Sequence, residues 1–579
     1  MNMTQKTKMC FAAKLLLLFL LLTPPVLSQA QFTFTSNSDG SLNISEYTGP
    51  GGAVVIPNTT NGLLITSIGD AAFFEKTNLT SVTVGTNVAI VADQAFSYSS
   101  MTSVTLPASV TNIAFDAFLD CNSLTAITVA ANNPDFSSMA GVLFNQNQTT
   151  LIGFPEGKAG AYSVPASVTN IGVYAFNDSS NLTSVALSSN VVSIEDYAFY
   201  DCPGLISITV DPNNPSFSSL AGVLFDKSQD TLIAYPVANL ATSYTVPDTV
   251  TNIGMEAFFG CPNLTTLTLG TNVVIVGNAA FEYCSALASI TFPNSVTVIG
   301  GDAFAECAGL TNITLGTGVT SILAQAFLAC PSVTAITVAA GNPAFSTVGD
   351  VLFNKNQTAL YLYPAGSSGT SYAIPNSVTN IVEDAFMDAY ELSSITLGTN
   401  VQSIGDSAFQ ECYSLTSITL PNSVTSLGYS SFFYCFNLAN IVIGSGLNNI
   451  GFQAFSYCFS LGGVYFAGNA PVMNSDVFDD DSVATAYYLP GTKGWNTTFD
   501  GLPTALWLPQ IVGSGVRTNQ FSFYIDWASN QMVVVEGCTN LSNPVWSPLQ
   551  TNVLTGSSWY FNDPQWTNYP GRYYRASSP

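Results

Sequence analysis

One phenylalanine position returns along this chain at an almost constant interval. Fourteen residues share it, and most neighbours in the series are 23 residues apart. A unit of this length cannot bury an apolar face by itself, so it is stable only when it stacks on the copies before and after it. The chain is therefore predicted to be a solenoid. The series consists of Phe73, Phe96, Phe118, Phe176, Phe199, Phe258, Phe281, Phe304, Phe327, Phe386, Phe409, Phe432, Phe455 and Phe478.

The second half of each repeat has the pattern of a short strand. In the copy at residues 250–272, leucines alternate with threonines just after the cysteine. An alternation of period two is typical of a strand with one face against a core. We therefore expect Leu267 and Leu269 to point inward, and Thr266 and Thr268 to point outward.

The first half of the repeat carries acidic residues two to four positions before the phenylalanine. Carboxylates at such places favour the start of a helical turn, because they accept hydrogen bonds from backbone N–H groups. Each coil is thus predicted to hold one strand, one tight turn and a helical or extended return. The acidic residues are Asp70, Asp93, Asp116, Asp196, Glu256, Asp302, Asp384 and Asp406.

Three intervals in the series are longer, at 58, 59 and 59 residues, so an insertion of about 36 residues occurs three times. In each insertion apolar runs flank a polar turn, which predicts a hairpin. We expect long coils at about residues 130–166, 211–248 and 339–376. They are interpreted as widened structural coils, with dedicated ligand loops as the alternative.

The repeats resemble a known family. Segments such as Val401–Leu420 and Val424–Ile443 follow the order Val-Thr-x-Ile-Gly-x-x-Ala-Phe-x-x-Cys-x-x-Leu-Thr-x-Ile-Thr-Leu, which is similar to the BspA-like leucine-rich repeats of secreted and surface proteins. The resemblance covers roughly residues 31–508. It implies a β-rich solenoid of 23-residue leucine-rich repeats with a parallel sheet, and a role as an adhesin or protein-binding surface protein.

The two ends of the chain differ from the repeats. Lysines precede the apolar run Leu15–Leu22, and small residues follow, which is the order of a secretory signal peptide. We predict cleavage after Ala30 and an exported protein, with an uncleaved signal anchor as the alternative; no later segment is apolar for long enough to span a membrane. Residues 31–66 are expected to form an N-terminal cap and residues 67–508 the solenoid with its C-terminal cap. Residues 509–579 hold four of the six tryptophans, with alternating strand patterns, and are expected to form a small all-β module.

The composition excludes several functional classes. The chain has no histidine, 11 Lys plus Arg, 36 Asp plus Glu and a formal net charge of -25. Without histidine there is no Ser-His-Asp triad and no histidine-ligated metal. An acidic chain with few basic residues is also unsuited to nucleic acid. We therefore predict no catalytic residue, no cofactor, no metal site and no nucleic-acid partner.

The outward strand face is the candidate binding surface. Its second outward position is threonine in ten strands, and the strand face is where leucine-rich repeats usually bind. Strand propensity and lateral packing are the alternative explanation for these threonines. The partner is expected to be an extracellular protein or glycan. The candidate residues are Thr83, Thr105, Thr128, Thr209, Thr268, Thr291, Thr314, Thr337, Thr396 and Thr419.

Cysteine follows the same period as phenylalanine, for example at Cys261, Cys284, Cys307 and Cys330. Equivalent positions in stacked strands lie about 4.8 Å apart, but their parallel side chains do not suit the dihedral angle of a disulfide. We therefore expect buried thiols that pack as small apolar side chains.

Two other functions compete with binding. A polysaccharide-active enzyme would need clustered carboxylates, but the acidic residues here lie on the turn before the phenylalanine and are interpreted as a solvated edge. Ice binding would need threonine at both outward positions of a flat array, which only strands such as Leu264–Leu269 provide.

Overall fold

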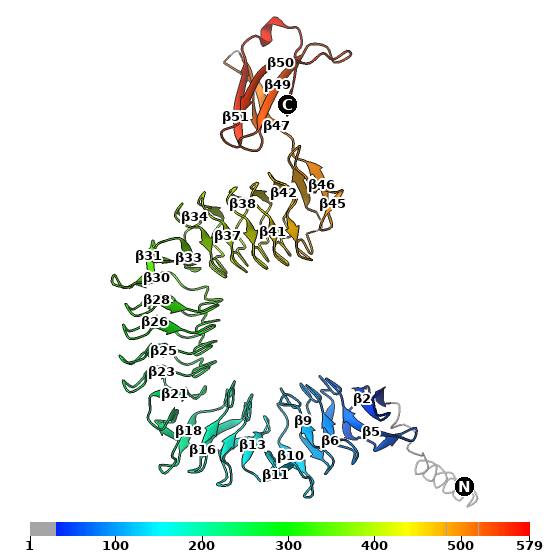
Figure 1. Cartoon of the computed structure of the whole chain (residues 1–579), viewed down its shortest axis with the longest axis vertical. Coiled ribbons are helices and arrows are strands. Elements are labelled where there is room, and N and C mark those ends of the chain that lie inside the picture. Colours follow the sequence, from blue (N-terminus) through cyan, green and yellow to red (C-terminus); the bar gives the residue numbers. More distant parts are fainter. Residues whose placement is uncertain (1–30, 482, 519, 579) are drawn as a thin grey trace, which may run out of the picture. The chain divides into compact units, whose positions relative to one another are not determined.

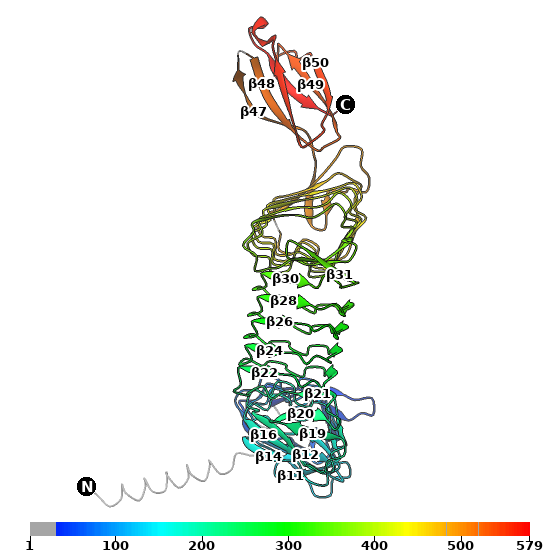
Figure 2. The ribbon, with the colours of Figure 1, turned by 90° about the vertical axis from the view of Figure 1, so that its left-hand side faces the viewer.

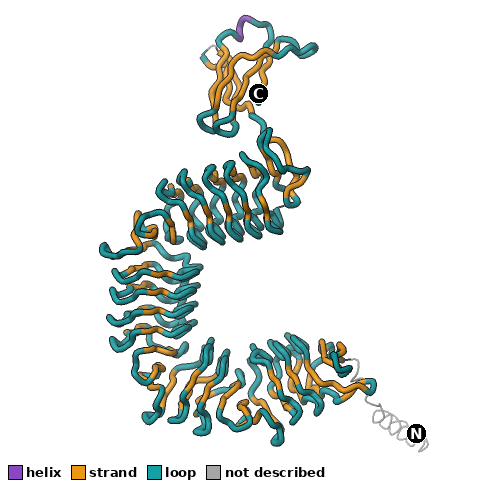
Figure 3. Tube along the Cα trace, in the orientation of Figure 1, coloured by secondary structure: helices purple, strands orange, loops and turns teal. Residues whose placement is uncertain are grey.

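The computed structural model describes residues 31–481, 483–518 and 520–578. The predicted signal peptide, residues 1–30, lies outside these described residues. The chain forms two compact units: the first runs to Leu287 and includes Ile299–Phe304, and the second comprises Ala288–Val298 and Ala305–Pro579. Strands and turns make up almost all of both units (Figure 3). In the described part of the chain the helical structure is one 3-10 helix, η2 (Trp566–Asn568).

Each coil contributes two short strands, one to a parallel sheet that we call the strand face and one to a return-side sheet (Figure 1). In the first unit the strand face consists of three groups. They are β3 (Gly52–Val55), β6 (Leu79–Thr83), β8 (Ser103–Leu106) and β10 (Ala126–Val129); then β14 (Gly160–Ser163), β16 (Leu182–Leu187) and β18 (Ser207–Val210); then β22 (Ser243–Thr245) and β24 (Thr266–Thr268).

The return side of the first unit also has three groups of strands. They are β1 (Phe32–Ser36), β2 (Leu42–Tyr47), β4 (Thr59–Thr60), β5 (Leu63–Ile68), β7 (Ile90–Val91) and β9 (Asn112–Ile113); then β11 (Phe136–Met139), β12 (Val142–Asn145), β13 (Thr150–Gly153), β15 (Asn170–Ile171) and β17 (Ser193–Ile194); then β19 (Phe217–Leu220), β20 (Val223–Asp226), β21 (Thr231–Ala234), β23 (Asn252–Ile253) and β25 (Ile275–Val276). Two further short strands are β27 (Val298–Ile299) and β29 (Ser321–Ile322).

The second unit repeats this arrangement. Its strand face holds β26 (Ser289–Thr291), β28 (Asn312–Leu315) and β30 (Ala335–Val338), then β34 (Ser371–Ala373), β36 (Ser394–Thr396), β38 (Ser417–Leu420), β40 (Asn440–Ile443), β42 (Gly463–Phe466), β44 (Thr485–Tyr488), β46 (Leu502–Leu506) and β45 (Thr498–Phe499). Its return side holds β31 (Phe345–Val348), β32 (Val351–Asn354), β33 (Ala359–Leu362), β35 (Asn380–Ile381), β37 (Ser403–Ile404), β39 (Ser426–Leu427), β41 (Asn449–Ile450) and β43 (Val472–Met473).

The core between the two sheets is built by the repeating apolar positions. Phe409 is fully buried and stacks on Phe386 at 4.9 Å and on Phe432 at 5.0 Å between ring centroids. These spacings match the distance between neighbouring strands, about 4.8 Å. Equivalent side chains therefore stack coil on coil, and the predicted β-rich solenoid is confirmed.

The prediction of a helical turn before the phenylalanine is wrong. The return segment is a pair of tight turns, and residues two before and two after the phenylalanine adopt left-handed backbone conformations, such as Asp384 at φ 55° and Asp388 at φ 61°. Alternate N–H groups of this segment donate to the next coil, for example Phe386 N to Ala408 O at 2.8 Å, while Met387 N and Ala389 N donate within the tight turns. Because these donors already have partners in the neighbouring coil, a helix that would use them internally does not form.

The three long coils contain more strand than the single hairpin predicted. In the first, β11, β12 and β13 pair antiparallel in sequence, so two hairpins follow each other. The polar turn after Asn145 joins β12 to β13, as predicted, and a turn at Ala140 and Gly141, both with positive φ, joins β11 to β12. β13 then pairs with β15 and not with β9, so the return-side ladder is interrupted at the long coil.

A buried asparagine anchors each of these long coils. Asn214, which is fully buried, donates to the carbonyls of Ser188 and Val191 at 2.8 Å, and its Oδ1 accepts hydrogen bonds from the N–H groups of Ser216 and Phe217 at 2.8 and 2.7 Å. Asn133 and Asn342 make the same four contacts in the other two long coils. All hydrogen-bonding positions of the amide are therefore used.

The cysteines of the described residues are buried thiols, as predicted. The thiol of Cys284 donates to the carbonyl of Phe258 at 3.1 Å, and Cys412 and Cys435 bond in the same way to Phe386 and Phe409. The carbonyl belongs to the phenylalanine of the preceding coil. The thiol thus satisfies a buried acceptor, which explains why cysteine keeps the period of the repeat.

The C-terminal residues form a small antiparallel module, as predicted. Its strands are β47 (Gln510–Arg517), β48 (Gln520–Asp526) and β51 (Ser558–Asp563) in one sheet, and β50 (Ser547–Val553), β49 (Met532–Cys538) and β52 (Tyr573–Ser577) in the other. Phe523, Ile525 and Val535 are buried between the two sheets. The indole N–H of Trp527 donates to the carbonyl of Trp507 at 2.9 Å.

Candidate functional site

The ten candidate threonines all lie at outward positions of the strand face. Nine are exposed and Thr314 is half-buried, whereas their neighbours in sequence, such as Ile290 and Ile313, are buried. Thr83, Thr105 and Thr128 face one another across β6, β8 and β10 in the first unit. In the second unit Thr291, Thr314 and Thr337 face one another across β26, β28 and β30, which stand one above another in Figure 2.

The hydroxyl rows are shorter than the spacing of the repeat suggests. Thr268 faces Thr245, but Thr209 faces Ala186 and Thr396 faces Ala373. Within one hydrogen-bonded sheet, threonine therefore occupies this position in at most three neighbouring strands. Small hydroxyls of this kind supply little binding energy each.

The last coils place aromatic rings in the same outward row. Thr419 faces Val442, which faces Tyr465, which faces Tyr487. The rings of Tyr465 and Tyr487 stack at 4.8 Å and 10°, and the Trp507 ring lies 5.2 Å from Tyr465. Both tyrosines are half-buried. The strand register shows that Tyr465 and Tyr487 continue the row that contains Thr419. Composition alone does not reveal this alignment.

Each long coil also opens a cavity on the return side. The cavities have volumes of about 530, 160 and 450 Å³ for the first, second and third long coil. Each cavity lies where the return-side sheet is interrupted. One side of the cavity is the turn of the short coil before the interruption, and the other side is the return-side strand of the long coil, which is not hydrogen-bonded to that short coil. The first cavity is the largest and carries the most ionisable side chains.

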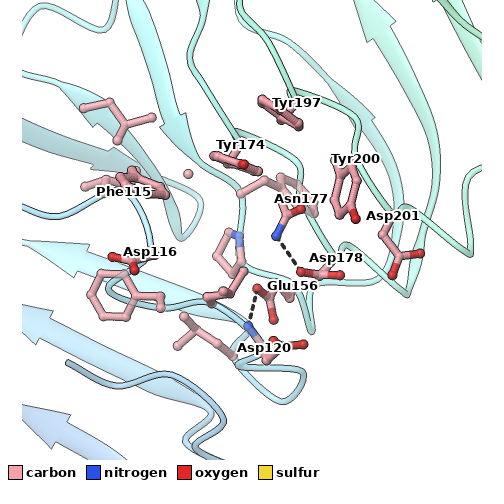
Figure 4. A pocket seen from close by; sticks show the side chains of 18 of the residues that line it. Phe115, Asp116, Asp120, Glu156, Tyr174, Asn177, Asp178, Tyr197, Tyr200 and Asp201 are labelled. Atoms are coloured by element: carbon pink, nitrogen blue, oxygen red, sulfur yellow. Dashed lines mark hydrogen bonds between the residues drawn. The ribbon is translucent and has the colours of Figure 1, made fainter. Parts of the chain in front are cut away.

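Aromatic rings line one wall of the first cavity (Figure 4). Phe115 stacks on Tyr174 at 5.5 Å and 17°, and Tyr174 stacks on Tyr197 at 4.8 Å and 14°. Tyr200 completes the wall, 6.0 Å from Tyr197. Phe115 and Tyr174 stand on either side of the inserted long coil in sequence, so the aromatic row bridges the interruption in the ladder.

Carboxyl groups line the opposite wall, and Glu156 lies deepest among them, with 6% of its surface exposed. Its Oε1 accepts a hydrogen bond from the backbone N–H of Asp120 at 2.9 Å, and its Oε2 has no hydrogen-bond partner in the protein. Burial raises the pKa of Glu156 to about 9, with the negative charges of Asp178 and Asp120 adding to the effect. Burial likewise raises the pKa of Asp178 to about 7 and that of Glu256 to about 8.

The interpretation of the acidic residues as a solvated edge is therefore wrong at this place. Of the acidic residues that precede a phenylalanine, Asp116 and Glu256 are half-buried and line the cavity beside the interruption in the ladder. Glu156 was missed by sequence reasoning. The signal that would have found it is a comparison of the three long coils, which read Phe154-Pro155-Glu156, Tyr235-Pro236-Val237 and Tyr363-Pro364-Ala365.

Four carboxyl groups of this cavity share one direction of pKa shift. Here the pKa values of Glu156, Asp178, Asp201 and Glu256 are all shifted upward, by burial first. Across the described residues, no three acidic or cysteine side chains are placed so that together they could hold a metal ion.

The repeats match a known family model. The model for the BspA type leucine rich repeat region matches at residues 53–159, 154–230, 235–359 and 363–484, in six copies. The chain belongs to the BspA-type leucine-rich repeat family. This membership supports a role in interaction or adhesion built on repeats, and proteins of this type are typically secreted or carried on the cell surface. In the described part of the chain, no helix has the length and apolar character that crossing a membrane requires.

Solved structures of bacterial proteins are among those similar to this chain. A leucine rich cell surface protein from Faecalibacterium prausnitzii is 24% identical over 80% of this chain and 94% of its own, with a TM-score of 0.38. A leucine-rich repeat protein from Eubacterium ventriosum is 22% identical over 69% of this chain and 91% of its own, with a TM-score of 0.40. The pneumococcal vaccine antigen PcpA is 16% identical over 82% of this chain and 96% of its own, with a TM-score of 0.34. Among curated proteins, none matches this chain.

Proposed function

We propose that this BspA-type protein is exported after cleavage near Ala30 and binds extracellular proteins or glycans through its strand face, without catalysis. The observation that carries the proposal is the row of outward positions in the second unit. There the threonines of β26, β28 and β30 line up in register, and the row through Thr419 ends in the stacked pair Tyr465 and Tyr487. Hydroxyls supply polar contacts, and aromatic rings supply the large, rigid contact areas that concentrate binding energy.

The geometry of the solenoid suits weak contacts that add up. Each coil offers one or two small side chains at a spacing set by the sheet, so an extended partner touches several coils at once. Contacts that are linked in this way bind more tightly together than any one of them does alone. In this proposal β1 to β5 close the first unit as a cap at residues 31–66, residues 67–508 form the binding solenoid, and residues 509–579 are a separate module.

The test is a binding screen with the purified protein. It is applied to an array of glycans and to a panel of immobilised extracellular-matrix proteins, and compared with a variant that carries Thr291→Lys, Thr314→Lys and Thr337→Lys. The control variant carries Thr320→Lys, Gln402→Lys and Thr425→Lys, three exposed positions that directly precede return-side strands. Both variants gain the same charge, so only the face differs.

We expect at least one partner whose capture falls at least tenfold in the strand-face variant and less than twofold in the control. A separate variant, Tyr465→Ala, should weaken capture of a glycan partner. The proposal is contradicted if no glycan or protein is captured, or if both lysine variants lose capture equally. New reducing ends after incubation with the glycans would show catalysis and would contradict the non-enzymatic part.

A further inference from the structure

We propose that the first cavity is a binding site for an organic cation, a guanidinium or primary ammonium group. The cation enters between the aromatic wall of Phe115, Tyr174 and Tyr197 and the carboxyl wall around Glu156 (Figure 4). It comes either from a free small amine or from an arginine or lysine side chain of a partner polypeptide. The site is distinct from the strand face, because it lies on the return side of the first unit.

The three long coils show that the fold does not require a carboxyl at position 156. The equivalent residues Val237 and Ala365 are apolar, and all three side chains are buried, with 6%, 8% and 8% of their surfaces exposed. Burying a carboxyl costs stability unless its oxygens are satisfied. A glutamate in a place that suits valine or alanine elsewhere in the same chain therefore points to a function.

One carboxyl oxygen of Glu156 accepts a hydrogen bond from the protein, and the other accepts none. In most coils the N–H two residues after the phenylalanine donates to a carbonyl of the next coil, as Asp178 N does to Tyr200 O at 3.2 Å. The long coil supplies no such carbonyl to Asp120, and Glu156 Oε1 takes its place at 2.9 Å. Oε2 is buried, has no partner in the protein and belongs to the wall of the cavity.

A second acceptor of the same wall is also without a partner. Asn177 is buried, and its Nδ2 donates to the carboxylate of Asp178, while its Oδ1 has no hydrogen-bond partner. Two residues that line one cavity therefore each have a buried acceptor that a hydrogen-bond donor of a ligand would satisfy. Asp178 and Asp201 surround them with negative charge, and no basic residue lines the cavity.

The carboxyl groups narrow the donor to a cation. Phe115, Tyr174 and Tyr197 stack face to face on one another, so the row offers the ligand apolar contact and not free ring faces. A planar guanidinium bonds a carboxylate with two N–H groups and has flat, weakly hydrated faces that suit such contact. A neutral donor such as a sugar hydroxyl would not stabilise the ionised form of these carboxyl groups, whereas a cation does. The volume of about 530 Å³ is sufficient for a side chain of this size.

The test measures binding by isothermal titration calorimetry with two probes. One is agmatine, a free guanidinium amine; the other is a capped seven-residue peptide with one central arginine among glycine and serine. A peptide of the same length with citrulline in place of arginine is the neutral control. The variants are Glu156→Gln, which keeps the acceptor for Asp120 and removes the charge, and Glu156→Val, which introduces the residue of the second long coil. Glu75→Gln removes an exposed carboxylate at the position equivalent to Asp120 in an earlier coil and is the matched control.

We expect at least one arginine-type probe to bind. Its affinity should fall at least tenfold in both Glu156 variants and less than twofold in Glu75→Gln. Binding by agmatine alone assigns the site to a free amine, and equal or tighter binding by the peptide assigns it to a polypeptide side chain. Glu156→Val should melt at an equal or higher temperature than the native chain, so lost binding is not lost folding. The proposal is overturned if neither probe binds, if citrulline binds as well as arginine, or if the Glu156 variants bind normally.

The pH dependence gives a second readout on the same variants. Glu156 is opposed by the charges of Asp120 on the turn before it and of Asp178 on the turn after it, and burial holds its pKa near 9. A cation stabilises the ionised carboxyl, so binding should release protons and become tighter as the pH rises from 6 to 9. In Glu156→Gln this increase should be reduced. An affinity that stays constant over this range, together with no proton release, would contradict the role of Glu156.

Discussion

Replacing Asn214 by alanine should release the hairpin of β19 and β20 from the stack. The side chain makes four hydrogen bonds of 2.7 to 2.8 Å and is fully buried. At about 1 kcal/mol net for each bond, alanine removes about 4 kcal/mol, and it leaves two carbonyls and two N–H groups buried without partners. The effect should be local, because coils of a solenoid contact only their neighbours.

Hydrogen exchange read by mass spectrometry measures this effect directly. Protection of the amides in β19 and β20 should fall by about a thousandfold, since every 1.4 kcal/mol is a factor of ten. The control is Asn213→Ala, an exposed neighbour whose side chain bonds only to Asp211, and its protection should change less than threefold.

The variant Asn214→Asp distinguishes the hydrogen bonds that the side chain donates from those that it accepts. The carboxylate still accepts from Ser216 and Phe217 but faces the carbonyl oxygens of Ser188 and Val191, which raises its pKa above the value in the unfolded chain. The folded state then binds more protons than the unfolded state, so the hairpin of this variant should be most protected at low pH and lose protection as the pH rises. Equal protection in Asn214→Ala and Asn213→Ala, or an Asp variant insensitive to pH, would refute the reasoning.

Two further predictions concern the core. Phe409→Ala should lower the free energy of unfolding by about 3 to 5 kcal/mol, because it empties a buried site between two stacked rings, whereas Tyr429→Ala at an exposed position should change it by less than about 1 kcal/mol; denaturant unfolding followed by circular dichroism compares them. Cys412 and Cys435 should react slowly with a thiol reagent in the native protein, because burial raises the pKa of both thiols, and rapidly after unfolding without reductant. Failure to label the unfolded, unreduced chain would instead indicate disulfides.

The stacking of coils was predictable because its cause is local. The interval between Phe386, Phe409 and Phe432 equals the length of one coil, so the period alone places equivalent rings one above another. The alternation around Leu267 likewise shows which side chains enter the core, since successive residues of a strand point to opposite faces. The thiol character of the cysteines followed from the same geometry.

The return side was predicted less well, because two structures compete for the same residues. Acidic residues before phenylalanine are typical of a helix start, but in this chain their N–H groups donate to the next coil. Asp384, with φ of 55°, lies in a turn that no local preference for helix predicts. The neighbouring coil decides this conformation, and its influence is not visible within one repeat.

The period and the alternation of the sequence by themselves determined the solenoid, its inward and outward faces and the position of the long coils. Only the tertiary structure decided what lies beside the interruption in the ladder. Phe115 meets Tyr174, and Glu156 meets Asp120, although the partners lie 59 and 36 positions apart in the sequence. These contacts form because the return-side strands on either side of the long coil do not pair with each other. Strand pairing depends on how whole coils stack, so the sequence around the contacting residues does not reveal it.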